Sequence, residues 1–305
     1  MSLFMHLNST KTYHARFPVD LMTECTVCET LAHPGTPTAR ALGITRPYGA
    51  LVGDFLRSKG LLAPGCRVLE LGCGYGSLME GLLRHHGDVV GRAFMADLSP
   101  RLVTRQRERL SGVSPRALHV MADIHELPFR GGAFDLVIVN EVAGDLDTIV
   151  GVDASAMPGD LSSIVEKYGL ETPTSGPFAF NLGAVRLVEE LCVLSGAVFL
   201  SEHSSDPVVP ASMPYLATGL AVDSFPRRIP LSGHDEYTVR FSHLEKVARS
   251  HGRTVHTGPL IEVLGLEPRP SWRFIFTAKA CSTEEQALIG EFLDHVREYR
   301  WLLIS

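Results

Sequence analysis

The stretch from Val68 to Leu78 constrains the fold of this chain more than any other. It reads VLELGCGYGSL, an apolar run with an acid near its end, then glycines at alternate positions, then the start of a helical apolar pattern. This order predicts a buried strand, a tight turn and a helix. Glycine lets such a loop turn sharply and lets a ligand lie against the backbone, facing the first helical N–H groups. The spacing G-x-G-x-G differs from the dinucleotide fingerprint G-x-G-x-x-G.

The composition is that of a soluble globular enzyme. The chain has 305 residues, of which 45% are hydrophobic and 20% charged, and no apolar run approaches the roughly 20 residues of a membrane span. Its net charge of −6 argues against a broad nucleic-acid-binding surface. The first residues lack a basic region followed by an apolar core, so we expect no secretion signal. We predict a cytoplasmic protein, monomeric or homodimeric, with reduced thiols.

One cysteine pair raises the possibility of a metal site. Cys25 and Cys28 form a C-x-x-C pair, half of a zinc or redox motif, which His14 and His33 could complete. No second C-x-x-C exists in the sequence. Because half-motifs arise easily by chance, we predict two ordinary thiols and no metal site.

Two further apolar runs end in acids. Asp97 follows a predicted strand about 20 residues after the glycine loop, the spacing at which a nucleotide-binding α/β fold places a carboxylate on ribose hydroxyls. The alternative is that Asp97 only caps the following helix. Asp123 ends the next run, and it is followed by Leu-Pro-Phe at 127–129 and Phe-Asp at 134–135. Three strand ends therefore carry residues suited to one nucleotide-like ligand.

Together these motifs resemble the class I S-adenosylmethionine (SAM)-dependent methyltransferases. ELGCGYG resembles their motif I, Asp97 their motif II acid, and the run from Asp123 their "D…LPF…FD" pattern. The resemblance implies SAM as cofactor and S-adenosylhomocysteine as product, with Glu70 near the SAM ammonium group, Asp97 on the ribose, and Asp123 with Ile124 at the adenine. The cofactor-binding residues predicted in this way are Glu70, Gly72, Cys73, Gly74, Gly76, Asp97, Leu98, Asp123, Ile124, Asn140 and Tyr48.

The resemblance also implies the architecture. We expect a Rossmann-like α/β fold with a seven-stranded, mostly parallel sheet whose last strand is antiparallel. Residues 1–45 would form an N-terminal extension or cap that includes a helical segment, and 46–305 the SAM-dependent methyltransferase domain. An insertion after strand four, at 147–181, would lie on the acceptor side, where such insertions commonly form a lid.

Local patterns predict the remaining elements. Residues 253–263 and 272–279 are predicted as the sixth and seventh strands, and 282–305 as a C-terminal helix with an apolar end. Tyr48 opens a helix that precedes the first strand. It is either a SAM neighbour or, as base rates for aromatic residues favour, a buried core side chain.

The acceptor should meet SAM at the carboxyl ends of the strands. Glu141 follows the fourth strand, and a carboxylate there can orient an amine or guanidinium through charge-assisted hydrogen bonds. Glu202 and His203 end the fifth strand, and His234 lies in a later loop. We hypothesise that Glu141 acts on the acceptor and that Glu202, His203 and His234 are secondary catalytic residues, the alternative being plain loop contacts.

The acceptor class stays open. Residues 140–147 and 229–265 partly resemble the MidA-like methyltransferases, the complex I assembly-factor family that methylates an arginine of a partner subunit, which implies a protein acceptor. The alternative is a small metabolite or natural product methylated on N or O. A second alternative is a SAM-binding assembly factor without turnover. The Asn/Asp-Pro-Pro-Tyr motif of DNA amino methyltransferases is absent from the sequence.

Overall fold

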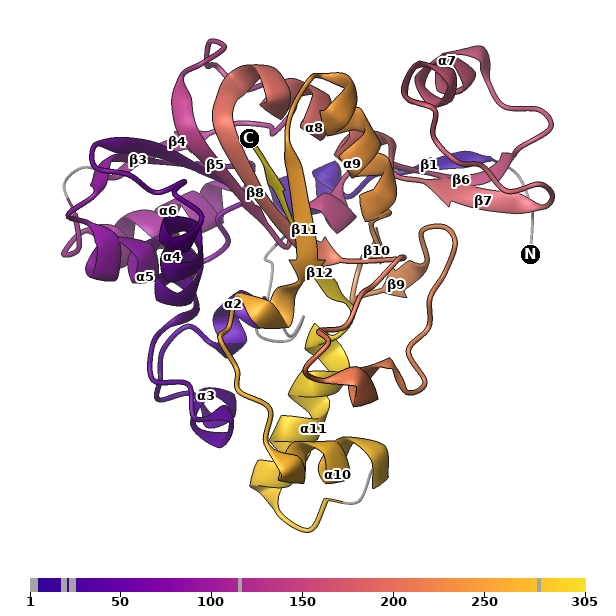
Figure 1. Ribbon diagram of the computed structural model, residues 1–305. Coiled ribbons are helices and arrows are strands. Elements are labelled where there is room, and N and C mark those ends of the chain that lie inside the picture. Colours follow the sequence, from indigo (N-terminus) through magenta and orange to yellow (C-terminus); the bar gives the residue numbers. More distant parts are fainter. Residues whose placement is uncertain (1–4, 18–20, 22–25, 115–116, 279–280) are drawn as a thin grey trace.

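A seven-stranded sheet forms the centre of the structure, a computed structural model that describes residues 5–17, 21, 26–114, 117–278 and 281–305 (Figure 1). Its strand order is β11-β12-β8-β5-β2-β3-β4. The parallel pairs are β5–β8, β2–β5, β2–β3 and β3–β4, and β12 runs antiparallel to both of its neighbours. This topology confirms the predicted fold class. The strands are β2 (Cys66–Leu71), β3 (Val90–Asp97), β4 (Ala117–Met121), β5 (Phe134–Asn140), β8 (Ser195–His203), β11 (Val255–Pro259) and β12 (Tyr299–Ile304).

Helices cover both faces of this sheet because its strands are apolar on both sides. Val68 and Ile138 pack in one hydrophobic cluster, whereas their chain neighbours Leu69 and Val139 pack in a second cluster on the opposite face. The helices of the first face are α4 (Tyr48–Ser58), α5 (Ser77–His86) and α6 (Pro100–Leu110), and those of the second are α8 (Leu182–Leu194) and α9 (Phe241–Ser250). The strand ends stay uncovered by these helices, which leaves room for a ligand.

The C-terminal region corrects the prediction. The segment predicted as strand seven lies in helix α10 (Pro270–Ala278), and the predicted C-terminal helix ends at Val296, where α11 (Glu284–Val296) stops. The apolar end of the chain is β12, and all six of its residues are buried. A short apolar run buried on every side has no periodicity that separates a strand from a helix. The sixth strand, β11, lies within the predicted range.

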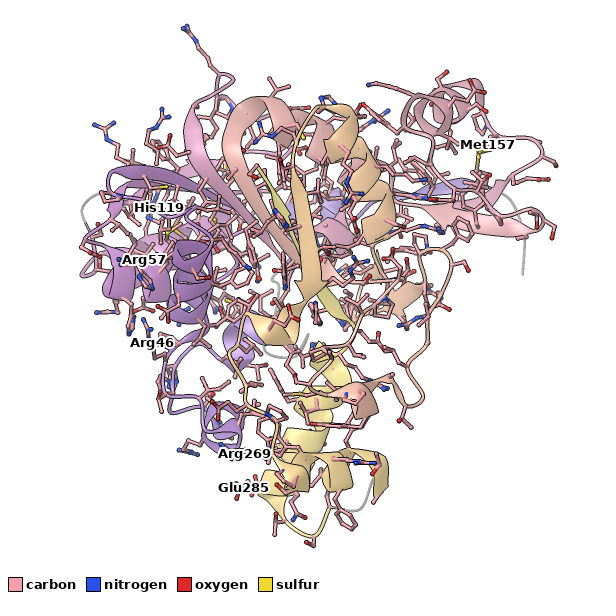
Figure 2. The ribbon with its side chains drawn as sticks, in the orientation of Figure 1. Arg46, Arg57, His119, Met157, Arg269 and Glu285 are labelled. Atoms are coloured by element: carbon pink, nitrogen blue, oxygen red, sulfur yellow. The ribbon has the colours of Figure 1, made fainter. Side chains whose placement is uncertain are left out.

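A helical lobe projects below the sheet. It contains α3 (Pro37–Leu42), α10 and α11, and α3 packs on α11. Arg269, at the start of α10, donates a hydrogen bond from Nη2 to the carbonyl of Leu42 at 3.2 Å (Figure 2). The lobe thus joins the N-terminal part of the chain to its C-terminal part.

The N-terminus and the insertion after β5 pair with one another. Residues 5–17, here called the strap, contain β1 (His6–Asn8) and α1 (Lys11–Arg16), and β1 pairs antiparallel with β6 of the insertion. The insertion comprises β6 (Thr148–Asp153), α7 (Gly159–Tyr168) and β7 (Pro177–Phe180). The remaining elements are α2 (Val27–Thr30), η1 (Ala143–Asp145), η2 (Pro214–Ala217), β9 (Arg228–Pro230), β10 (Asp235–Tyr237) and η3 (Leu260–Glu262). Within the described ranges, no helix is long and apolar enough to cross a membrane.

Candidate functional site

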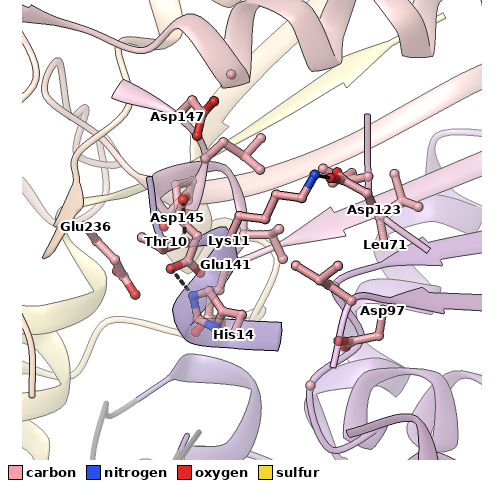
Figure 3. A pocket seen from close by; sticks show the side chains of 18 of the residues that line it. Thr10, Lys11, His14, Leu71, Asp97, Asp123, Glu141, Asp145, Asp147 and Glu236 are labelled. Atoms are coloured by element: carbon pink, nitrogen blue, oxygen red, sulfur yellow. Dashed lines mark hydrogen bonds and ion pairs between the residues drawn. The ribbon is translucent and has the colours of Figure 1, made fainter. Parts of the chain in front are cut away.

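A cavity of about 730 Å³ lies at the carboxyl ends of the parallel strands (Figure 3). Its volume falls in the roughly 300–1,000 Å³ range of small-molecule pockets. One end, called the cofactor end, is lined by Gly72, Gly74, Asp97, Leu98, Asp123 and Ile124. The other end, called the acceptor end, is lined by Glu141, Asp145, Glu202, His203, Glu236, His295 and Tyr299. The strap covers both, and of the predicted insertion only Asp147 lines the cavity, so the lid comes mainly from the N-terminus.

The glycine loop needs its glycines for two reasons. Gly72, Gly74 and Gly76 have φ values of 63°, 50° and 80°, in the left-handed region that side chains disfavour. A Cβ on Gly72 would also lie 2.3 Å from Cγ2 of Val142, and one on Gly74 would lie 2.6 Å from Cδ1 of Leu21. The loop therefore presents bare backbone to the cavity and leads into α5.

Glu70 is a buried acid directly before this loop. Burial, together with the nearby carboxylates of Asp97 and Glu29, raises its pKa to about 8. Its Oε2 has no hydrogen-bond partner in the described part of the chain. Cys73 fastens the loop, since its Sγ lies 3.1 Å from the carbonyl oxygen of Glu70. An ammonium group nearby would satisfy the carboxylate that the fold leaves unpaired.

Asp97 and Gln106 connect the second strand end to the glycine loop. Asp97 Oδ1 accepts a hydrogen bond from the N–H of Ser99 at 2.9 Å, while its Oδ2 accepts from Gln106 Nε2 at 3.1 Å. The N-cap of α6 is Ser99 itself. Gln106 Nε2 also donates to the carbonyl of Gly74 at 3.0 Å. Burial raises the pKa of Asp97 to about 6. Gln106 had no signal in the sequence, because a glutamine on an amphipathic helix is usually exposed.

Asp123 is paired with the strap. Lys11 extends from α1 across the cofactor end and forms an ion pair with Asp123 Oδ2, while Oδ1 accepts from the N–H of His125 at 3.0 Å (Figure 3). Burial alone would raise the pKa of Asp123, but these two donors hold it below its usual value. The strap therefore contacts the acid that the resemblance assigns to the adenine.

Tyr48 and Asn140 lie behind the cavity wall. Tyr48 is fully buried, and its hydroxyl donates to Asn140 Oδ1 at 2.7 Å, as does the Ser201 hydroxyl at 2.6 Å. Asn140 Nδ2 donates in turn to Glu141 Oε1 at 3.1 Å. Neither Tyr48 nor Asn140 lines the cavity, and the same holds for Glu70, Cys73 and Gly76. These residues lie behind the residues that line the cavity.

Glu141 is held by the segment that follows the strap. Its Oε2 accepts a hydrogen bond from the N–H of Val27 at 2.8 Å, and its Oε1 accepts from the N–H of Cys28 at 3.1 Å, at the start of α2. Burial raises its pKa to about 7, although these bonds and the one from Asn140 lower it. Glu141 lines the cavity, but both of its oxygens already have backbone partners. Cys25 lies outside the described residues.

Glu202 and His203 form the wall of the acceptor end. Glu202 Oε2 accepts from the N–H of Gly144 at 3.0 Å, and burial together with the Glu236 carboxylate raises its pKa well above the usual value. The ring of His203 packs on that of Tyr299, with centroids 3.9 Å apart. Burial holds the pKa of His203 well below its usual range, so its imidazole is neutral at pH 7. The acceptor end thus combines acids that retain protons with a neutral imidazole.

His234 does not line the cavity but lies against residues that do. Its ring stacks on Tyr13 of the strap, with centroids 4.3 Å apart, and its Nε2 is 3.5 Å from Asp145 Oδ1. Asp145 Oδ1 is also 2.8 Å from Nε2 of His14, the residue that the sequence had placed near the cysteine pair. Burial would lower the pKa of His234, but Asp145 and Glu236 raise it to about 10.

Comparisons with known proteins agree with this geometry. Residues 68–156, which run from β2 into the insertion, match the family model described as a methyltransferase domain. This match and the fold support membership of the class I SAM-dependent methyltransferase superfamily. The cofactor of the chain is therefore SAM, and the residues present fit that cofactor, because the glycine loop offers a cradle that a Cβ would fill and Glu70 an unpaired buried carboxylate.

Curated methyltransferases match part of the chain. It is 40% identical over 86 residues to a malonyl-[acyl-carrier protein] O-methyltransferase of Halorhodospira halophila, which covers 27% of this chain and 28% of that protein. It is 33% identical over 119 residues to a ubiquinone biosynthesis O-methyltransferase of Roseobacter denitrificans, covering 36% of this chain and 46% of the relative. The chain thus spans less than half the length of either relative.

Solved structures share the fold over most of the chain. An uncharacterized protein of Burkholderia thailandensis aligns with a TM-score of 0.53 at 19% identity, covering 92% of this chain and 81% of that one. A B. thailandensis structure with bound S-adenosyl-homocysteine aligns with a TM-score of 0.52 at 19% identity, covering 88% and 76% of the two chains. At this identity the likeness shows a common fold.

Proposed function

We propose that this chain transfers the methyl group of SAM to a nitrogen atom, an amine or guanidinium, of an acceptor bound at the acceptor end of the cavity. The observation that carries the proposal is the set of carboxylates there. Glu141, Glu202 and Glu236 line this end. Lys11 and Arg186 also line the cavity, and Lys11 pairs with Asp123 at the cofactor end. A cationic acceptor would satisfy the charge of the three glutamates, and carboxylates also orient an N–H nucleophile by charge-assisted hydrogen bonds.

The cofactor end would hold SAM as the superfamily resemblance implies. We assign the glycine loop and Glu70 to the amino acid part, Asp97 with Leu98 to the ribose, and Asp123 with Ile124 to the adenine. Lys11 must then release Asp123 or move aside when the adenine binds. The strap and residues up to 45 would act as a cap over the domain formed by 46–305.

Proton handling favours Glu202 and His203 over Glu141. A nitrogen nucleophile must lose a proton during transfer, and the neutral ring of His203 can accept one. Burial and the neighbouring Glu236 carboxylate raise the pKa of Glu202, so a bound cation would favour its ionised form. Glu141, whose oxygens bind Val27 and Cys28, would instead position α2 beneath the acceptor. SAM supplies an activated methyl group, so the protein needs mainly to align the nucleophile and exclude water.

A small acceptor methylated on oxygen is the second candidate. The curated relatives act, by their names, on acyl-carrier-bound malonyl groups or quinone precursors, which favours oxygen acceptors. A neutral His203 could equally serve as general base for a hydroxyl group. Their matched stretches are short, and the partial MidA-like resemblance favours a protein guanidinium. A non-catalytic SAM-binding assembly factor, a cytoplasmic location and a monomeric or homodimeric state stay predictions.

The deciding experiment supplies methyl-labelled SAM to cell extract, both dialysed and undialysed, with Gly74→Arg as the inactive control. We expect label in precipitated protein, recovered after hydrolysis as an N-methylated amino acid, or in an amine of the small-molecule fraction. Label found only as a methyl ether or ester would overturn the nitrogen proposal in favour of the second candidate. Tight binding of S-adenosylhomocysteine without any labelled product would support the assembly factor.

A further inference from the structure

A cluster of metal-ligating side chains adjoins the acceptor end and has no part in the methyl transfer proposed above. His14 in α1, Asp145 in η1 and His234 before β10 each place one donor atom so that all three atoms lie within 4.8 Å of one another. The three residues come from segments far apart in the chain. Figure 3 shows His14 pointing at Asp145, with Glu236 to the left of these two residues.

The distances suit one metal ion. His14 Nε2 is 2.8 Å from Asp145 Oδ1, and His234 Nε2 is 3.5 Å from that same oxygen. Glu236 Oε1 is also 3.5 Å from His234 Nε2. A tetrahedral zinc ion with ligands at its usual bond lengths separates its donor atoms by about 3.3 Å. The 2.8 and 3.5 Å separations bracket this value, and the donor atoms of His14, Asp145 and His234 all lie within 4.8 Å of one another.

His234 also lacks the hydrogen bonds expected of a buried polar side chain. The side chain is 4% exposed. Neither ring nitrogen makes a hydrogen bond among the described residues, and Nε2 makes only ion-pair contacts of 3.5 Å with Asp145 and Glu236. Buried polar atoms are nearly always satisfied, so such a pair of nitrogens calls for an explanation. Tyr13 stacks on the ring and fixes its orientation. Imidazole nitrogens are common metal ligands, whereas an organic cation would gain little from two histidines.

We propose that His14, Asp145, His234 and Glu236 bind one divalent transition-metal ion of the zinc type. Two neutral imidazoles and two carboxylates balance the charge of such an ion, and a mixed nitrogen and oxygen set suits zinc better than calcium or magnesium. The ion ties the strap to η1 and to β10, so it holds the cap closed. It takes Glu236 from the acceptor end and leaves Glu141 and Glu202 to the acceptor, and the inference does not depend on methyl transfer.

Metal binding is tested on tag-free protein stripped with a chelator. The stripped protein is titrated with Zn²⁺ by calorimetry and with Co²⁺ by absorption spectroscopy, and its zinc content is measured after desalting. We expect one equivalent of zinc and the visible absorption of tetrahedral cobalt. Because Arg16 closes α1 and is exposed, zinc should also slow tryptic cleavage at that residue.

Variants assign the site. His14→Ala and His234→Ala should each weaken zinc binding by at least the roughly 10- to 100-fold that loss of a ligand's supporting partner costs. His256→Ala, an exposed histidine on β11, is the matched control and should bind as the unaltered protein does. No buried side chain comes from α1, so His14→Ala should keep the fold and its affinity for S-adenosylhomocysteine. Absence of bound zinc, or zinc affinity in both histidine variants equal to that of the unaltered protein, would overturn the proposal.

Discussion

Glu141 combines an unfavourable backbone conformation with favourable side-chain bonds. Its φ of 55° places it in the left-handed region, which costs a residue with a Cβ about 1–2 kcal/mol. Its carboxylate accepts hydrogen bonds from two N–H groups of α2. These bonds offset the cost, because hydrogen bonds to a charged group contribute about 1.5–3 kcal/mol each. This conformation directs the chain from β5 away from the sheet and toward η1, where Asp145 lies.

Glu202 is the residue at which the proposed chemistry can be tested most directly. Glu202→Gln keeps the size of the side chain but cannot ionise when a cationic acceptor binds, so we expect kcat/KM for the labelled acceptor to fall by about 100-fold or more. The affinity for S-adenosylhomocysteine should change by less than about threefold, since Glu202 lies at the other end of the cavity. Glu166→Gln, an exposed acid on α7, serves as the control. A loss of cofactor affinity in Glu202→Gln would place this acid in the cofactor site instead.

The loop between β2 and α5 is the element that the cofactor end depends on most. Its glycines meet two separate requirements, positive φ and close approach, and Gly60 provides a comparison because it has φ 72° but no atom within 4 Å of an added Cβ. Gly60→Ala should therefore lower the stability of the fold only through the unfavourable positive φ. Gly72→Ala should lower the stability through the positive φ and also through the overlap of the new Cβ with the Val142 side chain.

Urea unfolding can separate these two effects. We expect Gly60→Ala to lower the free energy of unfolding by about 1–2 kcal/mol and Gly72→Ala to lower it by more, because close-packed neighbours must move, at a typical cost of a further 1–3 kcal/mol or so. Val142→Ala should recover part of the loss in the Gly72→Ala background. It should recover none in the Gly60→Ala background. An equal loss of unfolding free energy at both glycines would show that the Val142 side chain moves aside without cost.

For the molecule as a whole, the fold concentrates buried acids at one edge of the sheet. Glu70, Glu141 and Glu202 all have pKa values raised mainly by burial, to about 8 and about 7 for the first two. Each is protonated in the folded protein at a pH where the unfolded chain has lost that proton. Folding stability therefore falls as pH rises from the unfolded pKa to the folded one, by up to about 1.4 kcal/mol per pH unit for each group.

The raised pKa values of these acids predict how the stability of the cofactor-free protein depends on pH. We expect the thermal unfolding midpoint to fall between pH 7 and pH 9, where His203 and His243, whose pKa values are lowered, are already neutral in both states. Glu70→Gln should make the fall shallower, because the amide has no proton to lose. S-adenosylhomocysteine should do the same if its ammonium group pairs with Glu70. A midpoint that stays level or rises over this range would contradict the prediction.

The sequence by itself determined the sheet and the cofactor end of the cavity. Glycine spacing, apolar runs and acids at strand ends are local features, and each acts through the few residues around it, as at Gly72, Asp97 and Asp123. The same reasoning failed at the C-terminus. Tyr299–Ile304 became a strand because β8 and β11 offered it two edges, and pairing between distant segments leaves no mark on a short apolar run.

Only the tertiary structure decided what surrounds the acceptor. Lys11 and His14 lie in a segment without strong periodicity, and they reach Asp123 and Asp145 because β1 pairs with β6 about 140 residues later. Glu141, which the sequence suggested for the acceptor, accepts hydrogen bonds from the N–H groups of Val27 and Cys28. The physical reason is the same in each case. A side chain's partner depends on which backbone segments pack together, and that packing is a sum over the whole chain that no local pattern records.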